Sequence, residues 1–230
     1  MRYIIGIDEV GRGCLAGPVT VTALAIPEDF DFSPPAGGFD FGLSSPEFNS
    51  KSKNLSALTS RPNLILRDSK KLSPRQREEW IVRLEQVPEI KFATKSVKPN
   101  LIDRINIANA ANLAVERALK ELFSKYEILP DDCSIYLDGG LYIKGRRHQE
   151  KNFKSASTVV KGDELVPAVS LASIVAKVYR DKYMDRLSRS YPQFLFNKHK
   201  GYATKVHREA IKEHGITEFH RLSFLKKILA

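Results

Sequence analysis

Cysteine is scarce in this 230-residue chain, and no long apolar run occurs in it. The two cysteines, Cys14 and Cys133, are too few for a disulfide framework, which favours a reducing compartment over secretion. No segment approaches the roughly 18 consecutive apolar residues that a membrane span requires. Acidic Asp8 and Glu9 stand where a signal peptide would carry its apolar region. We therefore expect a cytoplasmic protein with no membrane association.

The charge of the chain is the most informative feature of its composition. Lys and Arg together number 37 against 27 Asp and Glu, which gives a net charge of +10. The surplus lies after residue 66, because residues 67–230 contain 32 basic and 20 acidic side chains. A surplus of this size favours a polyanionic partner, with nucleic acid first, although a solvated basic surface is the alternative interpretation.

Short runs rich in β-branched residues alternate with helical patterns along most of the chain. We predict strands at residues 3–7, 19–26, 90–97, 134–137 and 157–160. We predict helices at residues 75–86, 99–126, 167–190, 207–214 and 222–229. This order predicts a single α/β domain over residues 1–230, with a central mixed sheet flanked by helices and a helical C-terminal segment from about residue 190. Residues 28–63, dense in Ser, Pro, Gly and Asn, are expected to form a flexible insertion.

Acidic residues follow three of the predicted strands. Asp8 and Glu9 come after the first strand, Asp138 after the fourth, and Asp163 shortly after the fifth. Because side chains at the ends of separate strands converge at one edge of a sheet, these carboxylates are candidates for one site. Like charges in one cleft raise one another's pKa unless divalent cations lie among them. Oxygen ligands favour Mg²⁺ or Mn²⁺, and a pair of such ions is a common arrangement for in-line displacement at phosphorus.

Each of these acidic residues also has an ordinary structural interpretation. Asp138 and Asp163 adjoin glycines, and aspartate beside glycine is common in turns. Neighbours on a regular strand point to opposite faces, so Asp8 and Glu9 would share a site only if the backbone bends or if Glu9 offers its carbonyl oxygen. The glycines of segment 11–13 would permit such a bend and a close approach of a ligand, but a tight turn is the simpler explanation for them.

Five separate motifs, taken together, resemble those of one known family. In chain order they are GIDEVGRG with LAGPV, RDSKKLS, YLDGG, VVKGD with PAVSLASIVAKVYRDKYM, and HKGYATKVH. The combination is similar to type 2 ribonuclease H, or ribonuclease HII, along the chain except residues 28–63. The resemblance implies a ribonuclease H-like fold and metal-dependent cleavage of RNA in RNA–DNA hybrids. It also implies hydrolysis on the 5′ side of a ribonucleotide embedded in duplex DNA, which leaves 3′-hydroxyl and 5′-phosphate ends and serves ribonucleotide removal during replication and repair.

The resemblance assigns both catalysis and metal binding to four carboxylates. They correspond to Asp8, Glu9, Asp138 and Asp163. Asp8 would bridge two Mg²⁺ or Mn²⁺ ions, with Asp163 completing one coordination shell and Glu9 and Asp138 the other. In this hypothesis one ion activates the attacking water and the second stabilises the leaving 3′-oxygen. No nucleophilic Ser or Cys constellation is evident in the sequence.

The resemblance also assigns three substrate-binding elements. The backbone of Gly11, Arg12 and Gly13 would read the ribose 2′-hydroxyl, the group that distinguishes RNA from DNA. Tyr202 would stack on the sugar that follows the ribonucleotide and help identify the RNA–DNA junction, although aromatic packing under the next helix is the alternative. Lys70 would contact the phosphate beside the scissile bond, although adjacent lysines are usually solvated.

Other polar residues have open interpretations. Lys177 and Arg180, about one turn apart on a predicted helix, would face either solvent or duplex phosphates. His199 and His207 show no metal-ligand spacing and are expected to be structural residues or phosphate contacts.

The chain departs from the family pattern at three positions, and two other functions remain as candidates. Cys14 stands where proline is usual, Gly140 where asparagine is usual, and Leu171 where a small residue is expected. A type 3 ribonuclease H would carry a lysine in place of Arg12 and an additional N-terminal domain. A non-catalytic duplex-binding protein would need no set of four carboxylates. We expect a monomer that acts on RNA–DNA hybrids and ribonucleotide-containing duplexes, and contact with a replication clamp or polymerase stays open.

Overall fold

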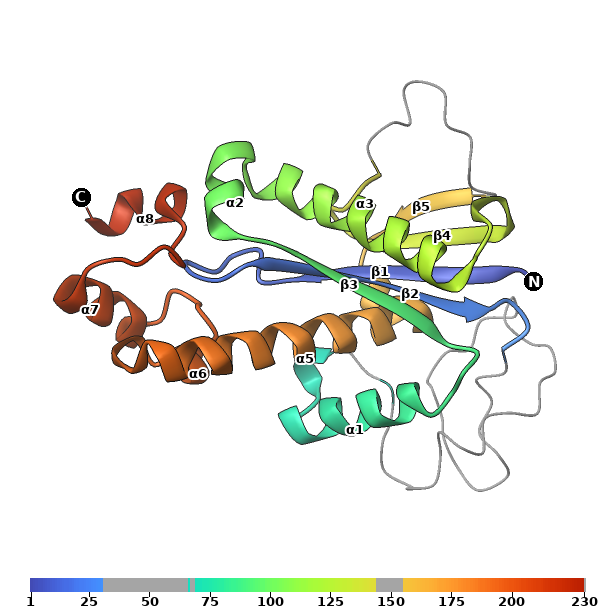
Figure 1. The fold of residues 1–230 in the computed structure, drawn as a ribbon, viewed down its shortest axis with the longest axis horizontal. Coiled ribbons are helices and arrows are strands. Elements are labelled where there is room, and N and C mark those ends of the chain that lie inside the picture. The colour runs from blue at the N-terminus through green and yellow to red at the C-terminus, as the bar shows by residue number, and fades with distance from the viewer. Residues whose placement is uncertain (31–65, 67–68, 144–154, 230) are drawn as a thin grey trace.

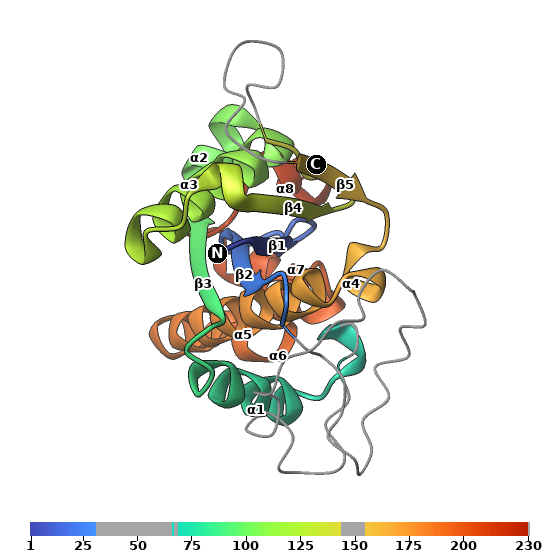
Figure 2. The same ribbon diagram turned by 90° about the vertical axis from the view of Figure 1, so that its right-hand side faces the viewer.

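A five-stranded mixed sheet with helices on both faces forms the centre of the molecule (Figures 1 and 2). The computed structural model describes residues 1–30, 66, 69–143 and 155–229, with side chains described as far as residue 226. The strands are β1 (Tyr3–Val10), β2 (Val19–Pro27), β3 (Lys91–Val97), β4 (Cys133–Asp138) and β5 (Ser155–Val159). The predicted α/β architecture is thus confirmed, while the predicted insertion at residues 28–63 lies outside the described residues apart from its first three.

The order of the strands brings three chain segments to one edge of the sheet. The order is β3-β2-β1-β4-β5, with β1–β2 and β2–β3 antiparallel and with β1–β4 and β4–β5 parallel. Ile7 pairs with Leu137, and Asp138 pairs with Val159. The C-terminal ends of β1, β4 and β5 therefore lie side by side, the position at which α/β sheets bind ligands.

Helices cover both faces of this sheet and continue beyond one end of it (Figure 1). They are α1 (Pro74–Glu85), α2 (Pro99–Ile105), α3 (Ile107–Tyr126), α4 (Gly162–Leu165), α5 (Pro167–Ser190), α6 (Phe196–His199), α7 (Lys205–His214) and α8 (Leu222–Leu229). Figure 2 shows α3 on one face of the sheet, with α5 and α1 on the other. Among the helices in the described ranges, none is both long enough and apolar enough to span a lipid bilayer.

The single helix predicted over residues 99–126 is interrupted at Asn106, so that prediction is wrong. Asn106 has a φ of 63°, which ends α2, and its side-chain oxygen accepts a hydrogen bond from the backbone N–H of Asn109 at 3.0 Å. Its ψ of 165° is not helical, and asparagine is a favoured N-cap. One residue therefore stops the first helix and begins the second.

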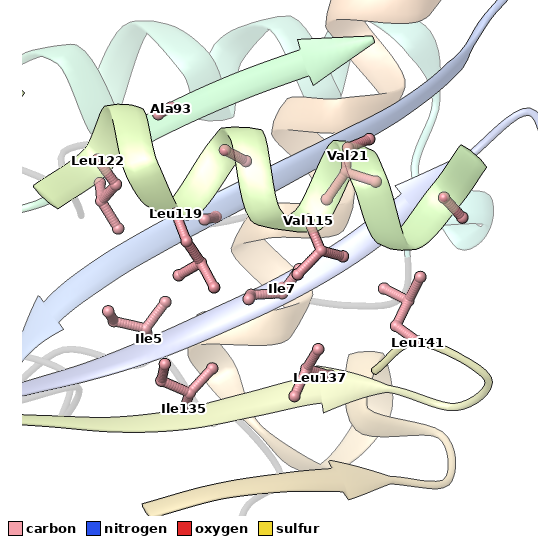
Figure 3. Packing of buried hydrophobic residues seen from close by; sticks show 14 of the residues in the cluster. Ile5, Ile7, Val21, Ala93, Val115, Leu119, Leu122, Ile135, Leu137 and Leu141 are labelled. Atoms are coloured by element: carbon pink, nitrogen blue, oxygen red, sulfur yellow. The ribbon is translucent and has the colours of Figure 1, made fainter. Parts of the chain in front are cut away.

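The core between the sheet and α3 follows the alternation of the strands. Successive side chains on a strand point to opposite faces, so every second residue of β1 and β4 enters this core. Figure 3 shows the apolar residues that meet there from three elements: Ile5, Ile7, Ile135, Leu137, Val115 and Leu119. A second core lies between the opposite face and α5, which begins with Pro167 at its first turn.

Gly6 allows α5 to lie directly against β1. A Cβ atom at this position would stand 2.0 Å from the carbonyl carbon of Ala168 and 2.2 Å from the nitrogen of Val169. Any larger residue would therefore push the start of α5 away from the strand. This close contact places the first turns of α5 beneath the end of β1 that carries Asp8 and Glu9.

The C-terminal segment packs around aromatic rings and histidines. Phe194 and Phe196 are fully buried, and the rings of His199 and His207 stack with 4.3 Å between their centroids. The Nε2 atom of His199 bonds the carbonyl oxygen of Phe194 at 2.8 Å, and Nδ1 of His207 bonds that of Tyr202 at 2.9 Å. The structural interpretation of these two histidines is the one that the contacts support.

Candidate active site at the ends of β1 and β4

Three carboxylates meet where β4 stops pairing with β1. The parallel register ends at Ile7 and Leu137, so Asp8 and Asp138 are the next residues on adjacent strands. One carboxylate oxygen from each of Asp8, Glu9 and Asp138 lies within 4.8 Å of the other two. Residues separated by about 130 positions in the sequence are thus joined by strand register alone.

Glu9 reaches this cluster without a bend in its strand. β1 stays paired with β2 as far as Val10, which opposes Thr20, so the backbone remains regular through both acidic residues. The expectation that Asp8 and Glu9 could share a site only through a bend or through the Glu9 carbonyl is therefore wrong. Glu9 lies two residues beyond the last β1–β4 pair, and its side-chain carboxylate is the group that joins the cluster.

Burial and mutual repulsion destabilise the charged forms of Asp8 and Glu9. Burial, followed by the neighbouring charge of Glu9, raises the pKa of Asp8 well above its ordinary value, although a hydrogen bond from Ser173 opposes this shift. Burial also raises the pKa of Glu9, while the hydrogen bond and charge of Arg12 lower it. The Asp8 side chain additionally accepts the backbone N–H of Glu9 at 2.7 Å.

The donor set fits a hard divalent cation. The Oε2 atom of Glu9 is buried and has no hydrogen-bond partner in the described part of the chain. A buried carboxylate oxygen without a donor is costly, and a bound cation removes both this cost and the repulsion between the three groups. Only oxygen atoms are offered, which matches Mg²⁺ or Mn²⁺.

Asp163 lies close to the cluster but is not one of the three residues in it. It occupies the first turn of α4 and is 8% exposed. The preceding residue, Gly162, donates its backbone N–H to Oδ1 of Asp138 at 2.8 Å. This bond fixes the start of α4 against the end of β4, so Asp163 is held beside the strand end that bears Asp138.

The predicted phosphate contact, Lys70, lies on the side of the site formed by α4. Its Nζ atom is 3.9 Å from Oδ2 of Asp163, and its side chain is 79% exposed. The adjacent Lys71 pairs instead with Glu164 at 3.1 Å. The two lysines of a short 3-10 turn therefore differ in position: only Lys70 contacts one of the four predicted carboxylates.

The β1–β2 loop, defined as residues 11–18, begins directly after the acidic pair. Gly11 has a φ of 86°, and a Cβ atom there would stand 2.1 Å from Nε of Arg180, so this glycine is required by the interior of the protein. Gly13 is exposed, and no atom lies within 4 Å of the position of its missing Cβ. Arg12 donates from Nη1 to Glu9 at 3.2 Å and to the carbonyl oxygen of Gly140 at 3.5 Å. Of these two glycines, Gly11 is therefore buried and Gly13 is open.

Tyr202 lies over the same loop. Its side chain is partly exposed, with 42% relative accessibility, and its phenol contacts the thiol of Cys14. Burial raises the pKa of this phenol, and the adjacent Cys14 raises it further. The Cys14 Sγ atom also lies 3.7 Å from the carbonyl oxygen of Lys200. The residue that replaces the usual proline thus touches the predicted sugar-stacking tyrosine.

Comparisons with known proteins agree on one family. The family model described as ribonuclease HII matches residues 5–36 and 54–227. The chain belongs to the ribonuclease HII family. A ribonuclease HII of Parabacteroides distasonis is 37% identical over 97% of this chain and 90% of that protein, and one of Treponema denticola is 36% identical over 98% and 100%. The protein is therefore a ribonuclease H, an enzyme that cleaves RNA in RNA–DNA hybrids.

Solved structures show the same fold. The ribonuclease H2 from Pyrococcus horikoshii OT3 superposes with a TM-score of 0.68 at 24% identity, covering 98% of this ribonuclease HII and 96% of that chain. The ribonuclease HII in a complex with PCNA from Archaeoglobus fulgidus gives 0.64 at 26% identity, covering 99% and 97%. Bst-RNase HIII, in complex with Mn²⁺, gives 0.65 at 20% identity, covering 99% and 69%. The predicted ribonuclease H-like fold is confirmed.

Two of the three departures from the ribonuclease HII pattern have a local explanation. Gly140 has a φ of 89°, and a Cβ atom there would stand 2.8 Å from Nη1 of Arg12, so glycine leaves room for the arginine. Leu171 is buried in the core between α5 and the sheet, where it fills space that a small residue would leave empty.

Sequence reasoning missed two arginines that shape this site. Arg180, expected to face solvent or phosphates, is 1% exposed and donates to the carbonyl oxygens of Ala16, Pro18 and Lys200, so that expectation is wrong. Arg221 was not singled out at all, although it is fully buried and binds the β1–β2 loop. A charged residue gives no sequence signal of burial, because its acceptors are backbone carbonyls from distant segments.

Proposed function

We propose that this ribonuclease HII hydrolyses the phosphodiester on the 5′ side of a ribonucleotide embedded in duplex DNA, in addition to the RNA of hybrids. The products carry 3′-hydroxyl and 5′-phosphate ends, and the reaction removes ribonucleotides during DNA replication and repair. One observation carries the proposal: carboxylates of Asp8, Glu9 and Asp138 lie within 4.8 Å of one another at the ends of adjacent parallel strands.

The proposed cofactors are two Mg²⁺ or Mn²⁺ ions, held by Asp8, Glu9, Asp138 and Asp163. Bound divalent ions supply an activated water nucleophile and charge stabilisation for the leaving 3′-oxygen. The unpartnered Oε2 atom of Glu9 supports this assignment, as does the Mn²⁺ complex of the structurally similar Bst-RNase HIII. Arg12 holds the other oxygen of Glu9, which keeps Oε2 free for a cation.

The residues around the carboxylates would select the substrate. The exposed Gly13 leaves space for a ribose to approach the backbone of the β1–β2 loop, which suits recognition of its 2′-hydroxyl. Tyr202 offers a partly exposed ring for stacking on the following sugar. Lys70 offers an exposed positive charge beside Asp163, where a phosphate next to the scissile bond would lie.

The proposed setting is a monomer in the cytoplasm. Both cysteines are free and buried, which suits a reducing compartment. The Archaeoglobus fulgidus relative was solved in a complex with PCNA, which supports a contact between this protein and a replication clamp.

A duplex with one central ribonucleotide tests the function directly. The enzyme is incubated with this duplex and Mg²⁺ or Mn²⁺, and the nick is mapped by the chemistry of its two ends. We expect cleavage immediately 5′ of the ribonucleotide and no cleavage of the all-DNA duplex. If the enzyme cleaves a uniform hybrid but does not nick the single-ribonucleotide duplex, its activity is that of a type 3 ribonuclease H. Nicking without a divalent ion would contradict the metal assignment.

A further inference from the structure

The two largest side chains that are fully buried in the described part of the molecule are arginines. Arg180 comes from the middle of α5, and Arg221 directly precedes α8. Both send their guanidinium groups to the carbonyl oxygens of the β1–β2 loop, which begins two residues after Glu9. Figure 1 shows the C-terminal segment beside this loop, at the end of the sheet where β1 turns into β2.

Arg221 binds the two peptide groups that join Gly11, Arg12 and Gly13. Its Nη2 atom donates to the carbonyl oxygen of Gly11 at 2.7 Å, and its Nη1 atom donates to that of Arg12 at 2.9 Å. Two further N–H groups bond the carbonyl oxygen of Gly17, from Nε at 3.0 Å and from Nη2 at 2.8 Å. One guanidinium thereby connects both ends of the β1–β2 loop.

These bonds determine the direction of two N–H groups. In a planar trans peptide the C=O and the following N–H point in opposite directions. Since the carbonyls of Gly11 and Arg12 point inward to Arg221, the N–H groups of Arg12 and Gly13 point outward, on the side where Gly13 is open. In the described residues, neither N–H has a hydrogen-bond acceptor.

Docking of the C-terminal segment does not explain the arginine. Within the described ranges, no carboxylate lies at ion-pair distance from Arg221, so its charge is solvated mainly by carbonyl dipoles, with the ring of Phe224 and the more distant charge of Asp103 as further support. Removing a charge from water is expensive, and an apolar side chain of similar volume would pack the same segment at lower cost. The forked guanidinium can hold several peptide groups in fixed orientations at the same time, which no apolar side chain can do.

We propose that Arg221 is a positioning residue that sets ribose selection by aiming the N–H groups of Arg12 and Gly13 at the 2′-hydroxyl. The proposal rests on the proposed function, and it adds that the residue before α8 controls the discrimination between ribose and deoxyribose. Arg180 has a different role, because it binds the carbonyls of Ala16, Pro18 and Lys200 and neither of these two peptides.

The Arg221→Lys variant tests this role. Lysine keeps the charge and the length but cannot bridge three carbonyls in a fixed plane. The measurements are kcat/KM for the single-ribonucleotide duplex and the inhibition constant of an all-DNA duplex as competitor. We expect kcat/KM to fall about tenfold, which is the loss of one well-aligned hydrogen bond. The inhibition constant should change by less than about twofold, because the all-DNA duplex has no 2′-hydroxyl to lose.

A matched control separates positioning from loosening of the C-terminal segment. The carboxylate of Asp103 accepts the backbone N–H groups of Leu222 and Ser223, both at 2.9 Å, and so anchors the start of α8 beside Arg221. Asp103→Ala should lower the melting temperature but leave the ratio of the two measurements at its wild-type value. If R221K is unfolded at the assay temperature, Phe224→Leu replaces it, since this ring lies 5.3 Å from the guanidinium and its loss should reduce selectivity partially.

The outcomes distinguish the inference from the function on which it rests. Equal losses for both duplexes, or an unchanged kcat/KM in R221K, would overturn the role of Arg221 while ribonucleotide cleavage by the wild-type enzyme stands. A wild-type enzyme that fails to nick the ribonucleotide duplex would overturn the proposed function itself. A selectivity loss in D103A equal to that in R221K would show that docking of α8, and not the guanidinium, is responsible.

Discussion

The carboxylate of Asp138 accepts a hydrogen bond from the backbone N–H of Gly162, with 2.8 Å between Oδ1 and the nitrogen. This bond joins the end of β4 to the residue before Asp163. Strand register has already placed Asp138 beside Asp8, so the four predicted carboxylates are delivered by three connected segments. Two adjacent strands and the helix bonded to one of them therefore hold the four side chains in place.

Neutralising Asp138 should abolish activity but raise the stability of the metal-free protein. We expect Asp138→Asn to abolish cleavage while duplex binding is largely kept, because the proposed metal ligand is lost and the basic surface is not. In metal-free buffer the same variant should melt about 2–4 °C higher than wild type, since roughly 1 kcal/mol of repulsion with Asp8 and Glu9 is removed. The asparagine oxygen still accepts the Gly162 N–H. Thermal unfolding with and without Mg²⁺ or Mn²⁺ checks both effects.

Asp131→Asn is the control for this charge change, because Asp131 is exposed and belongs to the short turn before β4. It should leave cleavage and metal-dependent stabilisation at the wild-type level. Retained cleavage in D138N would count against the whole carboxylate site. A metal-free D138N protein that melts below wild type would contradict the repulsion argument.

The two lysines of the 3-10 turn provide a matched pair. Lys70→Ala should reduce kcat/KM about tenfold, because a charge-assisted contact to a phosphate beside the scissile bond is lost. Lys71→Ala should change it by less than about twofold, since Lys71 pairs with Glu164 at the exposed surface. Steady-state kinetics on the single-ribonucleotide duplex measures both. Equal effects of the two substitutions would show that the lysines act only through general charge.

Substitution of Tyr202 should reduce cleavage most at an RNA–DNA junction. Tyr202→Ala is expected to lower cleavage of a single embedded ribonucleotide about tenfold, the effect of losing one stacking contact. A uniform RNA–DNA hybrid has no such junction at most cleavage positions and should be affected less. Tyr202→Phe keeps the ring, so it should remain close to wild type on both substrates. An equal loss on both substrates in Y202A would exclude a role at the junction.

Strand positions and most of the acidic residues could be predicted because the signals are local. Alternating apolar residues in β1 and β4 predict strands, and an acid that ends an apolar strand predicts a group at the edge of a sheet. The arrangement of Asp8 beside Asp138 then follows from parallel pairing. The way in which Glu9 reaches the cluster could not be predicted, because it depends on where the β1–β4 ladder ends.

The features that sequence reasoning missed depend on single residues in unusual environments. Asn106 interrupts a continuous helical pattern through one positive φ, which no periodicity reveals. Arg180 and Arg221 look like surface charges until the carbonyls that they bind are assembled from distant loops. Propensity and periodicity describe average environments, whereas these residues are determined by tertiary contacts.

A buried histidine pair should make the protein sensitive to acid. His207 and His220 face each other with 3.2 Å between their Nε2 atoms, and backbone groups satisfy both Nδ1 atoms. Burial is the main cause that lowers the pKa of each ring to about 4. Between pH 6.5 and pH 4 the unfolded chain therefore binds protons that the folded protein does not, so stability falls as the pH falls. Each ring contributes at most about 1.4 kcal/mol per pH unit in this window.

The difference in the free energy of unfolding between pH 7 and pH 5 tests this linkage. His220→Gln removes one titrating ring, so the loss of stability on acidification should be roughly 1–2 kcal/mol smaller than in wild type. Its stability at pH 7 should be lower, because a buried hydrogen bond is altered. His214→Gln changes an exposed histidine of α7 and should keep the wild-type dependence. Because the comparison is made between variants, the carboxylate contributions cancel, and an H220Q protein as acid-sensitive as wild type would show that the pair is not the cause.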